Sequence, residues 1–166
     1  EPWIGEDILE VGCGTGNITE YLVARGRVTA LDLDESYVEY VRERFRTCPG
    51  LRVLCADILR PPAGTLSPEG FDTIICFNVL EHIEQDDRAL AAMHDLLAPR
   101  GRAIILVPAL RILYGTIDAA RGHVRRYSRG DLLRRIRAQG FAPRKLSFFN
   151  AVGTIGWFAS GRILRR

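Results

Sequence analysis

The sequence predicts an α/β fold in which a doubly wound, mainly parallel sheet carries helices on both faces, as a three-layer α/β/α sandwich. Five short apolar runs alternate with segments of helical spacing, and this alternation is typical of parallel strands joined by helical crossovers. The length of 166 residues suits one domain, and 47% apolar residues are enough to build a core. We therefore expect residues 1–166 to form a single domain.

The first half of this pattern contains three strands and two helices. Short apolar runs predict strands at residues 8–11, 28–33 and 51–56. Between them, apolar residues recur at helical spacing over residues 17–25 and 36–45. Each strand is followed by a helix or loop that returns the chain to the same end of the sheet, as right-handed crossovers require.

The second half continues the pattern and then departs from it. Strands are predicted at 71–77 and 103–107, with a helix at 86–97 between them. After Pro108 the rhythm is lost until Ser128, a typical N-cap residue, which predicts a helix through Gln139. Residues 141–149 then predict a sixth strand. We expect residues 1–109 to bind a cofactor and residues 110–166 to form an acceptor side.

Charge is divided unevenly between these parts, although the net charge is only +3. Residues 1–98 hold 8 arginines and no lysine against 18 acidic residues, whereas residues 99–166 hold 15 basic residues against two aspartates. Such asymmetry is typical of a surface that faces a phosphorylated substrate, a membrane or a nucleic acid. A solvated basic helix face is the alternative.

The four cysteines, at positions 13, 48, 55 and 76, match no zinc or redox spacing. We expect them to be small buried residues in a reducing cytoplasm, and we expect no metal site.

A glycine turn follows the first predicted strand and precedes the first predicted helix. Gly12, Gly14 and Gly16 alternate with Cys13 and Thr15. Glycine permits positive φ and close approach of a ligand to the backbone, and the following helix offers free N–H groups. In an open α/β sheet, ligands bind at this edge. The turn therefore predicts a nucleotide-like ligand.

The residues around the turn narrow the ligand. Asp32, which closes the second strand, is expected to bind ribose hydroxyls, while Asp34 caps the next helix. A dinucleotide site needs a third glycine where Asn17 stands. Glu10 would repel a pyrophosphate but attract a methionine amino group. The pattern favours S-adenosylmethionine over NAD.

Five stretches together resemble the class I S-adenosylmethionine-dependent methyltransferases, especially the small-molecule branch that includes quinone-biosynthesis methyltransferases. They are LEVGCGTGNIT, VTALDLDESYVE, ADIL, FDTIICFNVLEHI and LLAPRGRAIILVPA. The resemblance covers residues 8–149 and implies a Rossmann-like sheet of seven strands. We find six, so the seventh is expected outside this sequence.

The resemblance also implies which residues contact the cofactor. Glu10, Gly12, Cys13 and Gly14 would line the methionine and ribose side, and Asp32 would hold the ribose. The other implied contacts are Leu33 and Ile58 on the adenine ring, Asp57 on its amine, and Asn78 near the methionine.

Two histidines are candidates for catalysis on the acceptor side. His82 follows the fourth strand, and His123 lies in GHVRRYS after the fifth strand. Either could act as a base, because oxygen acceptors usually need one. For His82 the alternative is a structural, hydrogen-bonded role at a helix start. Arg125, Arg126 and Tyr127 are predicted to clamp an anionic group.

The expected acceptor is a small molecule, anionic or linked to a lipid or glycan. The sequence disfavours a nucleic-acid partner, because Asn78-Val79-Leu80-Glu81 replaces the Pro-Pro-aromatic motif of base-methylating enzymes and no basic-aromatic platform is present. Residues 146–166 combine aromatic residues with basic flanks, which is typical of a membrane interface or of a segment packed against other residues. The expected location is cytoplasmic, with contact to the inner face of the membrane through this segment.

Two alternatives remain at this point. One is a methyltransferase-like module that binds cofactor or partner without catalysis. The other is an NAD-dependent oxidoreductase, which Asn17 disfavours.

Overall fold

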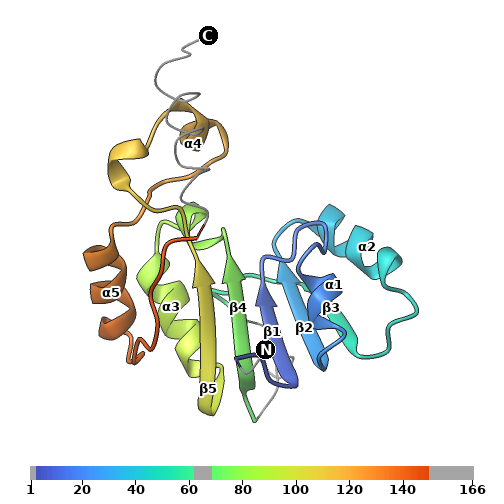
Figure 1. Cartoon of the computed structure of the whole chain (residues 1–166). Coiled ribbons are helices and arrows are strands. Elements are labelled where there is room, and N and C mark those ends of the chain that lie inside the picture. Colours follow the sequence, from blue (N-terminus) through green and yellow to red (C-terminus); the bar gives the residue numbers. More distant parts are fainter. Residues whose placement is uncertain (1–2, 62–68, 150–166) are drawn as a thin grey trace.

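The computed structural model describes residues 3–61 and 69–149, and these form a five-stranded sheet with helices on both faces (Figure 1). The strand order is β3-β2-β1-β4-β5, and every pair is parallel. The predicted doubly wound α/β fold is confirmed. The strands are β1 (Asp7–Val11), β2 (Arg27–Asp32), β3 (Leu51–Cys55), β4 (Phe71–Phe77) and β5 (Leu97–Leu106).

Four helices pack against the sheet, two on each face. They are α1 (Thr19–Leu22) and α2 (Glu35–Arg44) on one face, and α3 (Asp86–Asp95) and α5 (Arg129–Ala138) on the other. Three short helical elements lie in the connections: η1 (Leu80–His82), η2 (Arg111–Leu113) and α4 (Thr116–Ala120).

Alternation along β1 explains the two-sided core. Leu9 points to the face where Leu90 of α3 packs, whereas Ile8 points to the face where Val38 and Val41 of α2 pack. All of these side chains are fully buried. A strand buried on both faces needs apolar residues at successive positions, which is why β1 reads as a continuous apolar run.

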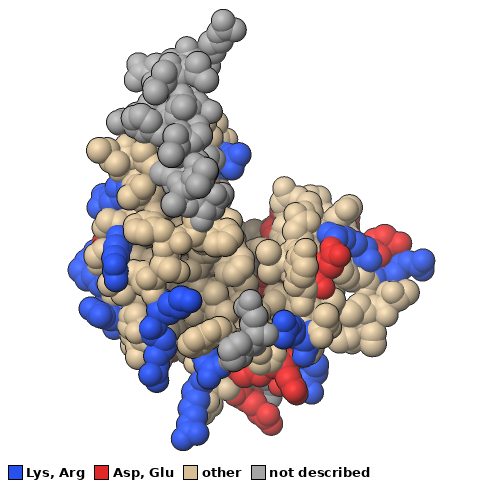
Figure 2. All heavy atoms as spheres, viewed as in Figure 1, with Lys and Arg blue, Asp and Glu red and all other residues tan. Residues whose placement is uncertain are grey.

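The winding of the sheet reverses between β1 and β4, which are neighbours although β2 and β3 separate them in sequence. At such a switch point the loops from the two strands diverge and leave room for a ligand. Figure 1 shows α4 beyond the carboxyl ends of β4 and β5. Figure 2 shows the surface hollowed between this part and the part that carries α1 and α2. The hollow lies at the edge where the glycine turn stands.

Figure 2 also shows Lys and Arg gathered on the side of the molecule that carries α5 and β5. The uneven charge of the sequence therefore corresponds to a basic surface in the described part of the chain. The anionic partner of that surface stays a prediction.

The predicted sixth strand at residues 141–149 is wrong. These residues run beside β5 toward the carboxyl edge without strand pairing (Figure 1). Leu146 packs against the core, but Phe148 and Phe149 are 63% and 80% exposed. A strand needs a neighbour to bond its backbone groups, and no strand in the described ranges supplies one here.

The four cysteines are free. Cys13 and Cys76 are buried as expected, and burial raises the pKa of each thiol to about 12. Cys48 is half-buried, and the expectation of burial is wrong for Cys55, which is exposed at the end of an edge strand.

No helix in residues 3–61 and 69–149 is long and apolar enough to cross a membrane. Most of the predicted membrane-contact segment, from residue 150 onward, lies outside the described residues.

Candidate active site

The glycine turn between β1 and α1 is held against the end of β2. The N–H groups of Gly12 and Cys13 both donate to the carbonyl oxygen of Leu31, over 2.8 and 3.0 Å. Gly12 has a φ of +78°, and a Cβ there would lie 2.3 Å from Cγ2 of Val79. Gly14 has a φ of +49°, but a Cβ there would meet no atom within 4 Å. A side chain at position 12 would clash, whereas the backbone at Gly14 faces open space.

Asp32 ends β2 and is joined to the same turn by its side chain. Its Oδ2 accepts from the N–H of Gly14 over 2.8 Å, and its Oδ1 accepts from the N–H of Asp34 over 3.1 Å. The side chain of Asp34 accepts from the N–H of Ser36 and caps α2. The predicted division between a strand-tip Asp32 and a helix-capping Asp34 is confirmed. Each oxygen of Asp32 keeps a lone pair for a further donor.

Glu10 lies in β1 and is 3% exposed. Its Oε2 accepts a hydrogen bond from the hydroxyl of Thr19 over 2.6 Å. Burial, opposed by the hydrogen bonds from Thr19 and assisted by the charge of Asp32, raises the pKa of Glu10 to about 7. A cation placed beside this carboxyl would favour its charged form.

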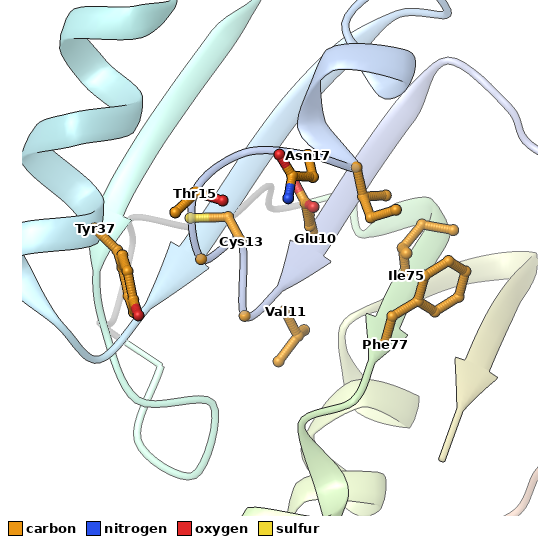
Figure 3. A pocket seen from close by; sticks show the side chains of 11 residues that line it. Glu10, Val11, Cys13, Thr15, Asn17, Tyr37, Ile75 and Phe77 are labelled. Carbon is orange, nitrogen blue, oxygen red and sulfur yellow. The ribbon is translucent and has the colours of Figure 1, made fainter. Parts of the chain in front are cut away.

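A pocket of about 310 Å³ opens at the turn (Figure 3). Four residues predicted to contact the cofactor line it, namely Glu10, Gly12, Cys13 and Gly14. In Figure 3 the pocket is bounded by the turn, by the side chain of Tyr37 from α2, and by those of Ile75 and Phe77 from β4. The structure thus brings the turn, α2 and β4 around one cavity.

Sequence reasoning missed part of this lining. Asn17, Tyr37, Ile75 and Phe77 were given no ligand contact, although Asn17 was used to exclude a dinucleotide. Phe77 is the last residue of a strand that ends at the ligand edge, and this position was the available signal. For Tyr37 the sequence showed only an apolar position on a helix.

The other predicted cofactor residues stand around the same edge but not in the pocket wall. Asp57 follows β3, and its Oδ1 accepts from the N–H of Leu59 over 2.8 Å. Leu33 is 68% exposed, whereas Ile58 is 4% exposed and packs in the core. Asn78 is exposed with a φ of +55°. Ile58 has little surface left for an adenine ring, and all four contacts stay predictions.

His82 and His123 meet although 40 residues separate them. Their ring centroids lie 4.8 Å apart in an edge-to-face arrangement. Nδ1 of His82 lies 3.2 Å from the carbonyl oxygen of Gly122, and Nδ1 of His123 lies 3.0 Å from Oδ1 of Asp118. Burial, and then the neighbouring His123, lower the pKa of His82. The predicted pair forms one cluster next to the end of β4.

Buried acids support this pair. Glu81 is 1% exposed, its carbonyl accepts from the N–H of Val124, and burial raises the pKa of its carboxyl to about 7. Asp118 is fully buried. Its burial is outweighed by hydrogen bonds from Arg126, the Gly115 N–H and His123, so its pKa is lowered and it stays charged. Neither acid was predicted to belong to the site.

The predicted anionic clamp does not form from Arg126 and Tyr127. Arg126 is 8% exposed; it donates to Asp118 over 2.8 Å and to the carbonyl of Ala109 over 3.1 Å. Tyr127 is 2% exposed, and its hydroxyl contacts Oδ2 of Asp86 at 2.8 Å. These side chains point into the fold, where they neutralise or bond buried acids. This placement does not favour their predicted contact to an acceptor, which stays a prediction.

Arg125 is likewise engaged inside the fold. Its guanidinium lies 2.6 Å from Oδ1 of Asp86 and donates to the carbonyl of Glu84 over 2.8 Å. Arg135 of α5 contacts the same Asp86 oxygen at 2.7 Å. Asp86 therefore ties GHVRRYS to α3 and α5. Arg125 is paired with this acid while its side chain is 23% exposed, and its predicted contact to an acceptor stays a prediction.

A family model described as a methyltransferase domain matches residues 9–103. The mitochondrial ubiquinone biosynthesis O-methyltransferase of Schizosaccharomyces pombe is 31% identical over 102 residues, which cover 61% of this chain and 37% of that protein. The chain thus spans well under half the length of this relative.

Solved structures share the fold. A putative methyltransferase from Bacillus halodurans superposes with a TM-score of 0.77 at 19% identity, over 87% of this chain and 66% of that one. The N-methyltransferase NodS from Bradyrhizobium japonicum, solved with S-adenosyl-L-homocysteine, gives a TM-score of 0.65 at 24% identity, over 81% of this chain and 65% of that one. At these identities the likeness shows the fold.

Proposed function

Because the chain belongs to the methyltransferase-domain family, whose cofactor is S-adenosylmethionine, we propose that it transfers a methyl group from this cofactor to a hydroxyl of a small acceptor. The observation that carries the proposal is that β4 ends at the pocket and leads directly into the segment that carries the histidine cluster. Phe77 lines the pocket at the end of β4, and His82 follows five residues later beside His123.

The residues of the pocket fit this cofactor. Glu10 is a buried carboxyl with a raised pKa, which a methionine ammonium group would stabilise in its charged form. The open space at Gly14 admits a ligand against the backbone. Asp32 has lone pairs left for two ribose hydroxyls.

The cofactor supplies a methyl group already activated on a sulfonium sulfur, so the chain's own residues mainly position and activate the acceptor. The acceptor oxygen bonds to the methyl carbon as the carbon–sulfur bond breaks. The hydroxyl proton passes to the cluster of His82 and His123. Burial and the neighbouring His123 lower the pKa of His82, so this imidazole is neutral near pH 7 and can accept the proton.

The acceptor atom is proposed to be an oxygen. The relative from Schizosaccharomyces pombe is an O-methyltransferase of ubiquinone biosynthesis, which supports an oxygen acceptor. An arginine clamp no longer supports an anionic acceptor, because Arg125 and Arg126 are paired with Asp86 and Asp118. Linkage of the acceptor to a lipid or glycan remains a prediction from the sequence.

Transfer of a labelled methyl group tests the proposal. The full-length protein is incubated with methyl-labelled S-adenosylmethionine and small-molecule and lipid fractions of its native lysate. We expect a labelled small molecule whose methyl group is bonded to oxygen. Cofactor binding without labelled product in any fraction would instead support a non-catalytic binding module.

A further inference from the structure

Three side chains of the acceptor site converge in a way that proton transfer does not require. Glu81, His82 and His123 each offer a ligand atom, and these atoms lie within 4.8 Å of one another. Glu81 and His82 come from η1, after β4, and His123 comes from the loop after α4. Two separate parts of the chain therefore contribute to the cluster.

The hydrogen bonds of the histidines determine which nitrogens remain. Nδ1 of His82 faces the carbonyl oxygen of Gly122, which can only accept, so this nitrogen carries the proton. Nδ1 of His123 faces the charged carboxylate of Asp118 and is protonated for the same reason. Both Nε2 atoms then keep a lone pair. Histidine ligands of metals are usually oriented in this manner, by a backbone carbonyl or a carboxylate on the other nitrogen.

Glu81 provides a second, independent observation. Its side chain is 1% exposed, and within the described part of the chain its Oε2 is buried without a hydrogen-bond partner. A buried carboxylate oxygen without a partner is unfavourable, and such groups usually bond a partner or coordinate a metal. The charge of Arg126 acts on Glu81 and lowers its pKa, but its guanidinium is hydrogen-bonded to Asp118 and not to this oxygen. The unpaired oxygen of Glu81 thus calls for a positively charged ligand.

We propose that Glu81, His82 and His123 bind a divalent transition-metal ion of the zinc type, with coordination positions left open for the acceptor. One carboxylate and two imidazoles form a donor set that suits Zn²⁺, Co²⁺ or Fe²⁺ better than Mg²⁺ or Ca²⁺, which prefer oxygen ligands. Three protein ligands with an open fourth position are typical of catalytic zinc sites. The expectation of no metal site considered only cysteine spacing.

The ion would bind the acceptor, a role for which Arg125 and Arg126 are not well placed. Glu81 would contribute one negative charge to a bound divalent ion, and the charges of Arg126 and Asp118 cancel each other. The site would therefore keep one net positive charge. The ion would hold the acceptor oxygen and lower the pKa of its hydroxyl. With the ion bound, the two histidines would act as ligands instead of as the proton acceptor, and the hydroxyl proton would leave to solvent before methyl transfer. This role rests on the proposed function, whereas binding of the ion does not.

Cobalt titration tests the site, because Co²⁺ replaces Zn²⁺ and absorbs visible light when bound by imidazole and carboxylate. The full chain is dialysed against a chelator and titrated with Co²⁺ alone, by calorimetry and by absorption. We expect one ion per chain and bands that Zn²⁺ displaces. Absence of both heat and bands would overturn the proposal.

Variants assign the ligands. His82→Ala and His123→Ala should each weaken Co²⁺ binding at least 100-fold, and Asp118→Asn should weaken it 10- to 100-fold through His123. Glu81→Gln keeps the side-chain volume and should weaken binding as strongly as the histidine variants. His94→Ala on α3, whose side chain is 44% exposed, is the matched control and should bind like the wild type. Equal binding by His82→Ala and the wild type, with both folded, would overturn the assignment.

Turnover separates the two proposals. If Co²⁺ binds but no acceptor is methylated, the metal site stands and the proposed function fails. If labelled methyl transfer proceeds at full rate in the presence of the chelator and no Co²⁺ bands appear, the function stands and the metal site is refuted.

Discussion

The N–H of Gly14 donates to Oδ2 of Asp32 over 2.8 Å, so the side chain at the tip of β2 bonds the glycine turn after β1. The side chain that is proposed to bind ribose thereby also fixes the turn that is proposed to face the methionine. Cofactor binding and the shape of the turn are coupled through this contact.

Replacing Asp32 with Ala should weaken binding of S-adenosylhomocysteine by about 1–3 kcal/mol, because the ribose hydroxyls and the N–H of Gly14 lose their acceptor. Calorimetry measures the change. Asp34→Ala is the matched control, since Asp34 is exposed and caps α2. It should lower the free energy of unfolding by about 1 kcal/mol and leave the affinity unchanged. An equal loss of affinity in both variants would contradict the role of Asp32.

Binding of the cofactor product should depend on pH through Glu10. In the free protein the pKa of this carboxyl is about 7, and a ligand ammonium group binds its charged form. The affinity for S-adenosylhomocysteine should therefore fall as the pH falls below 7, by about tenfold between pH 8 and pH 6. Calorimetry at the two pH values tests this, and an affinity that is constant with pH would contradict the ammonium contact.

Glu10→Gln should remove that pH dependence and should stabilise the free protein at pH 8. The pKa of Glu10 is raised from 4.5 in the unfolded chain to about 7 in the folded protein, so stability from this group is lost as the pH rises through that window. Glutamine keeps an acceptor for Thr19 without the buried charge. Thermal unfolding at pH 5 and pH 8 measures the effect, which should be present only at the higher pH.

Tyr127→Phe should lower the free energy of unfolding by about 1–2 kcal/mol, because the one buried hydroxyl hydrogen that Asp86 and the carbonyl of Leu80 share is removed. Denaturant unfolding measures it, with Tyr40→Phe as control, since Tyr40 is 54% exposed. Affinity for S-adenosylhomocysteine should not change. Unaltered stability combined with lost acceptor turnover would instead restore Tyr127 as an acceptor contact.

Gly12→Ala should destabilise the fold and weaken the pocket, because the new Cβ would lie 2.3 Å from Val79 at a φ of +78°. Gly130→Ala is the opposite case. Gly130 lies in α5 with open space around it, so alanine should raise the free energy of unfolding by about 0.5 kcal/mol. Thermal unfolding of both variants tests the pair, and similar melting temperatures would show that the turn tolerates a side chain.

Local signals predicted well wherever neighbouring residues decide the structure. Asp34 and Ser128 were recognised as helix caps, and in the structure each side chain accepts the N–H of a residue two or three positions on. The alternation of strands and helices likewise predicted a parallel sheet with helices on both faces, because parallel strands need crossover connections.

Sequence patterns did not predict the structure where the interacting partner lies far away in the sequence. The strand predicted at residues 141–149 depended on a pairing neighbour. Arg126 and Tyr127 looked like surface ligands, but their partners are Asp118 and Asp86, which the sequence does not mark as buried acids. The sequence did not predict that Glu81 and His123 converge, for the same reason. Between them lie 41 residues, and the two side chains come from different elements of the fold.

Titration of the full-length protein with S-adenosylhomocysteine and, separately, with NADH tests the central claim most directly. The account predicts saturable binding of S-adenosylhomocysteine at one site, weakened in Asp32→Ala, and no binding of NADH. Binding of NADH alone would contradict it.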